Sequence, residues 1–233
     1  MLRQAMILAG GLGTRLGAIS KNTPKPLLEV NGRPFLDHII QNIREQGVEK
    51  IILSVGYLAE QIISYLGDGA SLNVAIEYVI ETAPAGTGGA LILSKDKMDD
   101  NFFVLNGDTI FDIDYNDLAR LHMEEKAMAT IALREVDDST RYGNVGMEGN
   151  KVISYAEKKQ LGRGMINGGI YAMQKESIIY LPSLPCSLEN DLFPVLITKK
   201  LLSGKLYDGF FLDIGIPDAF KKADHLISRW QNS

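Results

Sequence analysis

A glycine-rich turn followed by two cations is the most informative local pattern in the chain. Residues 8–16 read Leu-Ala-Gly-Gly-Leu-Gly-Thr-Arg-Leu, directly after an apolar run, and a Pro-Lys-Pro at 24–26 follows shortly afterwards. Glycines let backbone N–H groups approach a phosphate or a base edge without a Cβ clash, and Arg15 and Lys25 can neutralise a triphosphate. Taken alone, each residue could belong to an ordinary strand-to-helix turn with surface cations. The combination favours a nucleotide phosphate site.

Two known phosphate-binding loops do not fit this turn. Leu16 stands where the third glycine of the dinucleotide-binding fingerprint belongs, which makes a Rossmann oxidoreductase a distant alternative. The Gly-Lys-Ser/Thr ending of a Walker A loop is missing. A different kind of nucleotide site is therefore expected.

Two aspartates end apolar, strand-like runs. Asp108 closes the segment 104–108, Val-Leu-Asn-Gly-Asp, and Asp213 closes Phe-Leu-Asp at 211–213. Two carboxylates at strand ends could hold one Mg²⁺, which usually takes few protein oxygens together with substrate phosphates. Either aspartate alone could instead be a helix cap or a turn residue. Together they predict a metal site for phosphate chemistry that needs no protein nucleophile.

The elements that must position these residues alternate between strands and helices in the first half of the chain. Strands are predicted at 5–9, 51–55, 74–79 and 102–105, and helices at 35–46, 58–66 and 88–95. Such alternation implies a mostly parallel α/β sheet with helices on both faces and ligands beyond the carboxyl ends of its strands.

The second half of the chain is richer in strands. Strand-like runs at 129–133, 143–147, 152–156 and 166–172 predict a small antiparallel layer. Helices are predicted at 188–202 and 217–230, on either side of a short strand at 210–212. Because no linker or low-complexity segment divides the chain, we expect a single domain over residues 1–233.

Composition narrows the partners and the compartment. The net charge of -5 provides no broad basic surface for nucleic acid. Cys186 is the only cysteine, so an internal disulfide is impossible and a reducing compartment fits. The apolar stretch within residues 1–11 is too short for an export signal, and no run reaches membrane-spanning length. We expect a cytoplasmic protein without membrane or nucleic-acid partners. Its oligomeric state stays open, a homodimer included.

The glycine-rich turn with its downstream Pro-Lys-Pro resembles the signature of the sugar-1-phosphate nucleotidyltransferases, and the resemblance extends over essentially the whole chain. It implies one Rossmann-like, GT-A-like domain, with a nucleotide-binding half of about residues 1–110 and a sugar-phosphate-binding half of about 111–233. It also implies transfer of a nucleotidyl group from an NTP to a sugar 1-phosphate, with Mg²⁺ as cofactor and pyrophosphate as product. The oxygen of the sugar phosphate would attack in line.

The same resemblance assigns residues to the two substrates. Arg15 would contact the β and γ phosphates, Lys25 the α-phosphate, and Lys158 the incoming sugar phosphate, although a charge run such as 157–159 is more often solvated. The catalytic residues it implies are Arg15, Lys25, Asp108, Lys158 and Asp213, with Asp108 and Asp213 as metal ligands. The nucleotide-binding residues are Leu8, Ala9, Gly10, Gly11, Gly13, Thr14, Arg15, Lys25, Glu81, Gly86, Thr87 and Asp108. The sugar-phosphate-binding residues are Asn106, Gly107, Tyr142, Gly143, Glu157, Lys158, Asn167, Gly168 and Asp213.

Glu81 bears on the choice of base. Thymidylyl and uridylyl members of the family commonly carry glutamine at this position, whereas a carboxylate can only accept hydrogen bonds. Guanine presents the adjacent donors N1–H and N2–H, so Glu81 predicts a preference for GTP over UTP. Thr87, in the same segment, is predicted to cap the helix that follows.

Further motifs narrow the resemblance within the family. The segments 105–109, 141–143, 166–171 and 211–217 are most similar to the guanylyltransferases that act on D-glycero-D-manno-heptose 1-phosphate. Guanylyltransferases for mannose 1-phosphate and uridylyltransferases for N-acetylmuramate 1-phosphate share much of the pattern and stay open as alternatives. A non-enzymatic nucleotide-sugar sensor is a further alternative, against which the retention of Arg15, Lys25 and the two aspartates argues.

Overall fold

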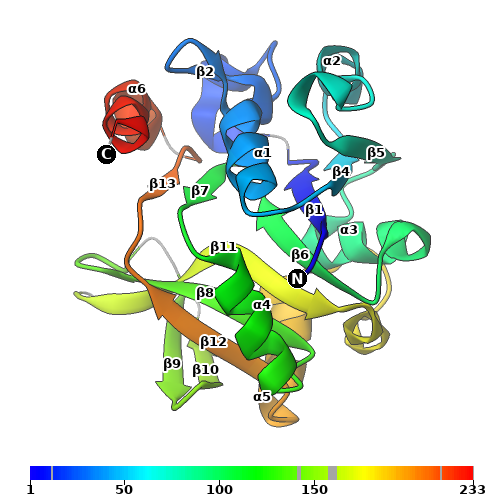
Figure 1. Cartoon of the computed structure of the whole chain (residues 1–233), viewed down its shortest axis with the longest axis vertical. Helices are drawn as coiled ribbons and strands as arrows, with labels where there is room; N and C mark the ends of the chain where they lie inside the picture. Colours follow the sequence, from blue (N-terminus) through cyan, green and yellow to red (C-terminus); the bar gives the residue numbers. More distant parts are fainter. Residues whose placement is uncertain (12, 141–142, 157–161, 216, 233) are drawn as a thin grey trace.

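A mixed β-sheet runs through the molecule (Figure 1). The computed structural model describes residues 1–11, 13–140, 143–156, 162–215 and 217–232. Within these ranges, nine strands follow the order β5-β4-β1-β6-β11-β8-β12-β10-β9. They are β1 (Gln4–Ala9), β4 (Lys50–Val55), β5 (Ala75–Ile80), β6 (Asn101–Asn106), β8 (Ala129–Val136), β9 (Asn144–Glu148), β10 (Lys151–Ala156), β11 (Gly164–Gln174) and β12 (Leu202–Tyr207). Two short ribbons pair β2 (Glu29–Val30) with β3 (Arg33–Pro34), and β7 (Thr109–Phe111) with β13 (Phe211–Asp213).

Helices cover both faces of this sheet. They are α1 (Phe35–Glu45), α2 (Ala59–Leu66), α3 (Gly86–Ser94), α4 (Tyr115–Glu124), α5 (Phe193–Thr198) and α6 (Pro217–Gln231). Short 3₁₀ helices lie at Thr14–Ser20, Lys25–Leu27, Ala70–Leu72, Lys95–Lys97 and Lys175–Tyr180, and a π-helical turn at Leu188–Leu192 precedes α5. No helix in the part of the chain that the structure describes is both long and apolar enough to cross a membrane.

The sheet contains two regions of parallel strands, which an antiparallel strand connects. Parallel pairs join β1 to β4 and β6, β4 to β5, and β8 to β12. Strand β11 runs antiparallel to both β6 and β8, and it thereby links the two parallel regions. The predicted α/β class is confirmed. The antiparallel strands expected as a small layer extend the same sheet instead of forming a separate one.

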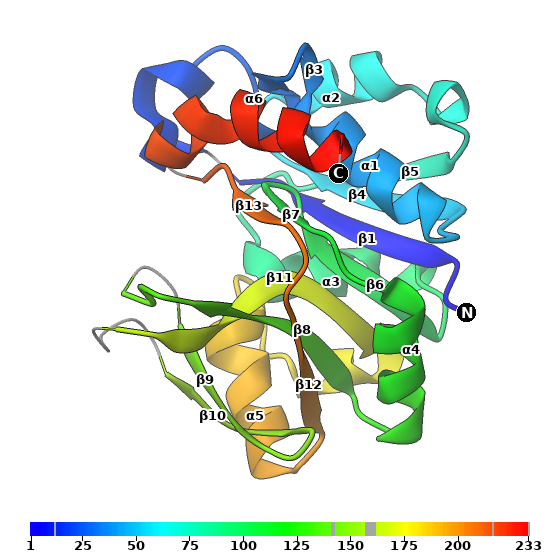
Figure 2. The same cartoon turned by 60° about the vertical axis from the view of Figure 1, so that its left-hand side comes forward.

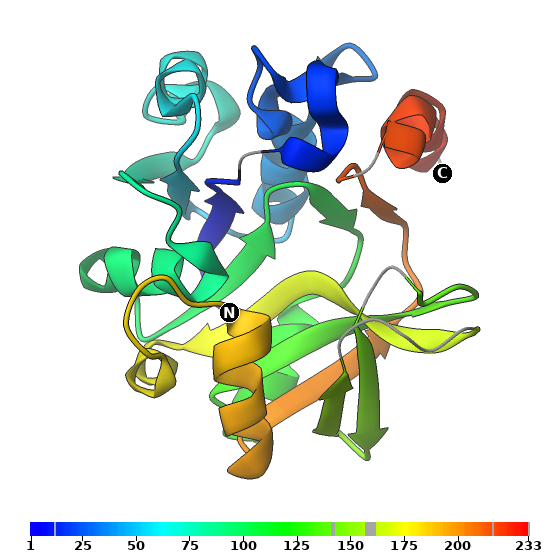
Figure 3. The ribbon, with the colours of Figure 1, turned by 180° about the vertical axis from the view of Figure 1, so that it is seen from behind.

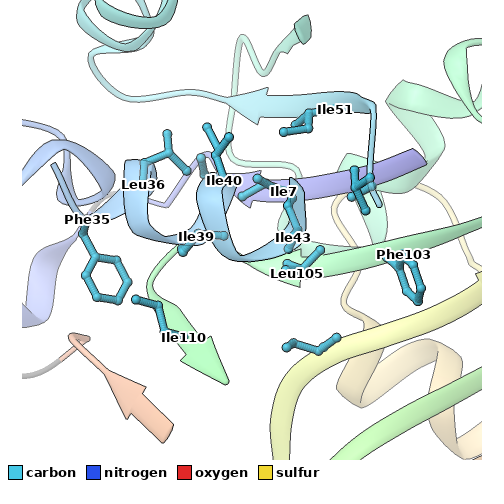
Figure 4. Close-up of a cluster of buried hydrophobic side chains, with 14 of the residues drawn as sticks. Ile7, Phe35, Leu36, Ile39, Ile40, Ile43, Ile51, Phe103, Leu105 and Ile110 are labelled. Atoms are coloured by element: carbon cyan, nitrogen blue, oxygen red, sulfur yellow. The ribbon is translucent and has the colours of Figure 1, made fainter. Parts of the chain in front are cut away.

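Hydrophobic side chains pack on both faces of the sheet. Successive residues of a strand point to opposite faces, and Met6 and Ile7 of β1 accordingly belong to two different buried clusters. On the face of Ile7, α1 contributes the isoleucines at 39, 40 and 43 (Figure 4), together with α2, α4 and α6. The opposite face is covered by α3 and α5 (Figure 3). Burial of each such side chain stabilises the fold by about 1.5–3 kcal/mol. The strand ends therefore extend from a well-packed core.

The main differences from the prediction are a shortened helix, an unexpected strand after it, and an unexpected helix α4. The helix expected over 188–202 ends at Thr198, where Lys200 adopts a left-handed conformation (φ 57°), and residues 202–207 form β12 beside β8. Tertiary pairing with a buried strand overrides the helical pattern there. Helix α4 was not predicted, although Asp114 caps it by accepting hydrogen bonds from the N–H groups of Asn116 (2.9 Å) and Asp117 (3.0 Å).

The C-terminal helix packs against the first half of the chain. In Figure 2, α6 crosses the same end of the molecule as the β2–β3 ribbon. The backbone N–H of Asn31 donates to Asp224 Oδ1 at 2.7 Å, and Trp230 Nε1–H donates to Asp112 Oδ2 at 2.9 Å. Helix α6 begins at Pro217, four residues after Asp213, and these contacts hold the helix against earlier parts of the chain.

Candidate active site

A cavity of about 870 Å³ opens where β1, β5 and β6 end. This is the edge at which open α/β sheets bind their ligands. The cavity is lined by many residues that the sequence singles out, namely Leu8, Ala9, Gly10, Gly11, Gly13, Lys25, Glu81, Gly86, Thr87, Asn106, Gly107, Asp108 and Gly143. These residues come from segments that are far apart in the chain, and the sheet brings them together.

Several predicted residues lie outside the described part of the chain. Tyr142, Glu157 and Lys158 are among the residues left undescribed, and so are the side chains of Thr14 and Arg15. Their assignments stay predictions from the sequence.

Glycines allow the strand ends to pack closely around the cavity. The N–H of Gly107 donates to the backbone oxygen of Leu8 at 2.9 Å, and a Cβ atom at residue 107 would lie 2.7 Å from that oxygen. A Cβ atom at Gly10 would lie 2.8 Å from Cδ of Glu81. The backbone contact at residue 107 requires glycine whatever ligand the cavity takes, whereas at residue 10 a side chain would displace the carboxylate of Glu81.

The carboxylate of Glu81 is held at the cavity wall by two donors. The hydroxyl of Ser54 donates to Oε1 at 2.8 Å, and the backbone N–H of Ala85 donates to Oε2 at 3.1 Å. A carboxylate oxygen has two lone pairs, so each keeps capacity for a second hydrogen bond. Glu81 can thus offer two oriented acceptors to a ligand.

The two predicted metal ligands lie side by side. Asp213 is opposite Thr109 in the β7–β13 ribbon, and the N–H of Ile214 donates to the backbone oxygen of Asp108 at 3.0 Å. A Cβ atom on Gly215 would lie 2.7 Å from Asp213 Oδ1 and 3.4 Å from Asp108 Oδ2. Because residue 215 has no side chain, the space between the two carboxylates is not filled.

This arrangement suits a small, hard divalent cation. In the described ranges no group of three or more His, Cys, Asp or Glu side chains converges, so the protein would supply two carboxylates. Mg²⁺ commonly completes its shell with substrate phosphates and water. Lys25 donates a hydrogen bond from Nζ to Asp108 Oδ2, which places a cation beside the same carboxylate. The residues therefore fit both a metal ion and a phosphate ligand.

On the sugar side, Asn167 is hydrogen-bonded to two tyrosines. Asn167 is not among the residues that line the cavity, whereas Tyr155 is. The amide of Asn167 donates to the hydroxyls of Tyr155 (3.2 Å) and Tyr171 (2.8 Å), and its oxygen accepts from the N–H of Gly169 (2.9 Å). Burial raises the pKa of Tyr171 well above its ordinary value, so its hydroxyl stays protonated. Asn167 thus orients Tyr155.

Gly168 serves packing in this structure. A Cβ atom at residue 168 would lie 2.5 Å from the ring of Phe111 and 2.8 Å from the backbone oxygen of Ala132. Like Asn167 and Asp213, Gly168 does not line the cavity. It lies where β11 crosses β7, and its small size permits that approach.

A segment that the sequence analysis missed closes another wall of the cavity. Ser187, Glu189 and Asn190 line it, beside Thr87. The hydroxyl of Thr87 accepts from the N–H of Leu188 at 2.8 Å and donates to Glu189 Oε2 at 2.8 Å. The prediction that Thr87 caps α3 is wrong, because α3 begins at Gly86 and the hydroxyl of Thr87 bridges to this distant segment instead.

The same segment occupies the first amides of α3. The N–H groups of Gly88 and Gly89 donate to the backbone oxygen of Cys186 at 3.0 and 3.1 Å, and the N–H of Cys186 donates to Ala85 at 3.0 Å. Ser187 caps the π-helical turn by accepting from the N–H of Asn190 at 2.9 Å. Serine is a favoured residue at a helix start, so local sequence could have indicated this start. No local signal connects 186–190 with a ligand. Its place in the cavity comes from tertiary packing.

Strand ends that gather a glycine-rich turn, Lys25 and Asp108 around one cavity, with Asp213 beside Asp108, are the arrangement expected of a nucleotidyl-transfer site. The family model for nucleotidyl transferases matches residues 4–229, and the chain belongs to this family. The expected family, fold and enzyme class are thereby confirmed.

Relatives with established names are similar over nearly the whole chain. The D-glycero-alpha-D-manno-heptose 1-phosphate guanylyltransferase of Aneurinibacillus thermoaerophilus is 38% identical over 223 residues, which cover 94% of this chain and 96% of that protein. The enzyme of the same name from Campylobacter jejuni is 40% identical over 219 residues, covering 93% and 96%. A crystal structure of HddC from Yersinia pseudotuberculosis complexed with GMP-PN is 35% identical with a TM-score of 0.85, covering 97% of this chain and 100% of that one.

Proposed function

We propose that the protein transfers a guanylyl group from GTP to a sugar 1-phosphate, with D-glycero-D-manno-heptose 1-phosphate as the favoured acceptor. The observation that carries this proposal is the cavity that brings Glu81, Lys25 and Asp108 together. The two heptose 1-phosphate guanylyltransferases, each about as long as this chain, support the choice of base and sugar. The GMP-PN complex of the Yersinia protein supports a guanine nucleotide as the donor substrate.

The reaction needs alignment and charge stabilisation but no protein nucleophile. An oxygen of the sugar phosphate forms a bond to the α-phosphorus, the bond from that phosphorus to the bridging oxygen breaks, and pyrophosphate leaves with the electron pair. Lys25 is proposed to stabilise negative charge on the α-phosphate, and Arg15 to bind the β and γ phosphates. Asp108 and Asp213 would hold Mg²⁺. A bound Mg²⁺ supplies charge neutralisation at the α-phosphate and the pyrophosphate.

The acceptor is proposed to enter from the side of Tyr155 and Gly143, both of which line the cavity. Lys158, predicted from the sequence, would pair with its phosphate, and Glu157 with hydroxyls of the sugar. A cytoplasmic location stays a prediction, and size-exclusion chromatography would decide between a monomer and a homodimer.

A substrate panel tests the proposal. The protein is incubated with Mg²⁺, one of four NTPs, and the 1-phosphate of heptose, mannose or N-acetylmuramate, and pyrophosphate release is measured. We expect the highest kcat/KM for GTP with heptose 1-phosphate. A higher kcat/KM with mannose 1-phosphate would identify mannose 1-phosphate as the acceptor in place of heptose 1-phosphate. A higher kcat/KM for UTP with N-acetylmuramate 1-phosphate would overturn the assignment as a guanylyltransferase. Nucleotide-sugar binding without any turnover would show a sensor.

A further inference from the structure

Strand β4 carries a polar residue where its pattern calls for an apolar one. Residues 51–55 read Ile-Ile-Leu-Ser-Val, and the side chain of Ser54 is 0% exposed. Burying a hydroxyl costs free energy unless it finds a hydrogen-bond partner. Its partner is Glu81, whose Oε1 accepts from Ser54 Oγ at 2.8 Å. A buried side chain inside the sheet is thereby joined to a residue that lines the cavity.

Strand pairing brings these two residues together. Strands β4 and β5 are parallel neighbours, with Ser54 opposite Val79 and Val55 opposite Ile80. The pairing continues past the end of β5, where the N–H of Glu81 donates to the backbone oxygen of Val55 at 2.8 Å. The position of Ser54 relative to Glu81 is therefore set by the sheet and not by a loop.

The contacts around Glu81 fix the orientation of its carboxylate. The terminal torsion of a glutamate has a broad energy minimum, so an unrestrained carboxylate samples many orientations. Here the N–H of Ala85 holds Oε2 at 3.1 Å, Ser54 holds Oε1, and Gly10 blocks movement on one side. Without Ser54, only one donor would remain.

We infer that Ser54 is a positioning residue for base selection: its hydroxyl orients Glu81 so that both carboxylate oxygens face the N1–H and N2–H donors of a guanine. This inference rests on the proposed function. Ser54 acts through Glu81 and does not contact the nucleotide. Its contribution must therefore disappear when residue 81 can no longer present two acceptors.

A double-mutant cycle tests this dependence. The variants are Ser54→Ala, Glu81→Gln and the double variant, and kcat/KM is measured for GTP and for UTP at saturating sugar 1-phosphate. In the wild-type background, loss of one hydrogen bond should lower the GTP/UTP ratio by about two-fold to ten-fold. In the Glu81→Gln background, the N–H of Ala85 already orients the amide oxygen, so Ser54→Ala should leave the ratio unchanged. The KM for the sugar 1-phosphate should stay at its wild-type value in Ser54→Ala.

Ser203→Ala is the matched control, because Ser203 is also a fully buried serine in a strand of the same sheet, but its hydroxyl accepts from Lys151 Nζ at 3.2 Å and is not bonded to Glu81. Its GTP/UTP ratio should equal that of the wild type, and thermal unfolding should show that all variants fold. The inference is overturned if Ser54→Ala keeps the wild-type ratio, or if it lowers the ratio equally in both backgrounds. Failure of the proposed function is a different result: the wild-type protein itself would then show no higher kcat/KM for GTP than for UTP.

Discussion

The carboxylate of Glu81 lies against the Cα of Gly10, so that a Cβ atom at residue 10 would stand 2.8 Å from Cδ of Glu81 and closer still to Oε1. The end of a glutamate side chain can move out of such a clash. Movement here breaks the hydrogen bonds from Ser54 and Ala85, however. The glycine is therefore needed to keep the carboxylate in its place at the cavity wall.

We predict that Gly10→Ala lowers the GTP/UTP selectivity strongly but costs only about 1 kcal/mol of unfolding free energy, since the clash is relieved by moving Glu81. Steady-state kinetics with both nucleotides and urea denaturation would measure the two quantities. Gly11→Ala is the stability control, because a Cβ at residue 11 meets no atom within 4 Å. Wild-type selectivity in Gly10→Ala would contradict the role of this contact.

The metal assignment predicts a shared effect of two aspartates that are far apart in the sequence but adjacent in the structure. Asp108→Asn and Asp213→Asn should each lower turnover by about 10²-fold or more, as when a main electrostatic stabiliser of a transition state is removed. Thermal unfolding should change little, because neither side chain belongs to the apolar core. Asp96→Asn, an exposed aspartate in the 3₁₀ helix Lys95–Lys97, is the control. Near-normal turnover in both active-site variants would show that the two aspartates are not the metal ligands.

The two lysines should act on different substrates. Lys25 lines the cavity beside Asp108, so Lys25→Ala is expected to lower kcat/KM for GTP. Lys158→Ala should chiefly raise the KM for the sugar 1-phosphate. Initial rates with each substrate varied in turn would separate the two effects. Equal effects of both variants on both substrates would argue against this division of roles.

Much of the site could be predicted because most of its residues lie close after strand ends and Lys25 lies in a distinctive Pro-Lys-Pro. Gly10, Gly11, Lys25, Glu81 and Asp108 all belong to local patterns, and the fold places them around one cavity. The wall formed by Ser187 and Glu189 could not be predicted in this way, since its contact with Thr87 joins residues about a hundred positions apart. Locally, the segment 187–191 indicates only a helix start.

The residues that orient cavity side chains could not be predicted from the sequence either. Ser54 is one hydroxyl within an apolar run, and its partner follows a neighbouring strand. Asn167 was expected to contact the sugar, yet in the structure its amide orients Tyr155 and Tyr171. Strand β12 lies almost entirely beyond the helix predicted over 188–202, and its pairing with β8 is a tertiary interaction that no local pattern indicates. Local patterns thus indicated the groups at the cavity edge better than the groups that support them.

A buried histidine predicts how stability depends on pH. Burial lowers the pKa of His122 from 6.5 to about 4, and Thr130 Oγ1 lies 3.0 Å from its Nδ1. As pH falls, His122 is protonated in the unfolded chain before it is protonated in the folded protein. The free energy of unfolding is therefore highest above pH 6.5 and decreases as pH falls toward about 4. The loss should approach roughly 3 kcal/mol of unfolding free energy.

Urea denaturation at several pH values between about 7 and about 5 measures this dependence. His122→Gln should show a shallower decline than the wild type. Some decline remains, because burial also lowers the pKa of His38. Equal slopes for the variant and the wild type would show that His122 does not titrate in this way.

The most direct test of guanine selection by Glu81 is kcat/KM for GTP and for UTP, measured in the wild type and in Glu81→Gln at saturating sugar 1-phosphate. Discrimination between two substrates is the ratio of these values. A mismatch that leaves a buried polar group unsatisfied costs about 1 to 3 kcal/mol, so the ratio should shift by roughly ten-fold to a hundred-fold toward UTP. We predict that the wild type prefers GTP and that Glu81→Gln narrows or reverses this preference. A wild type that prefers UTP, or a ratio that Glu81→Gln leaves unchanged, would contradict the account.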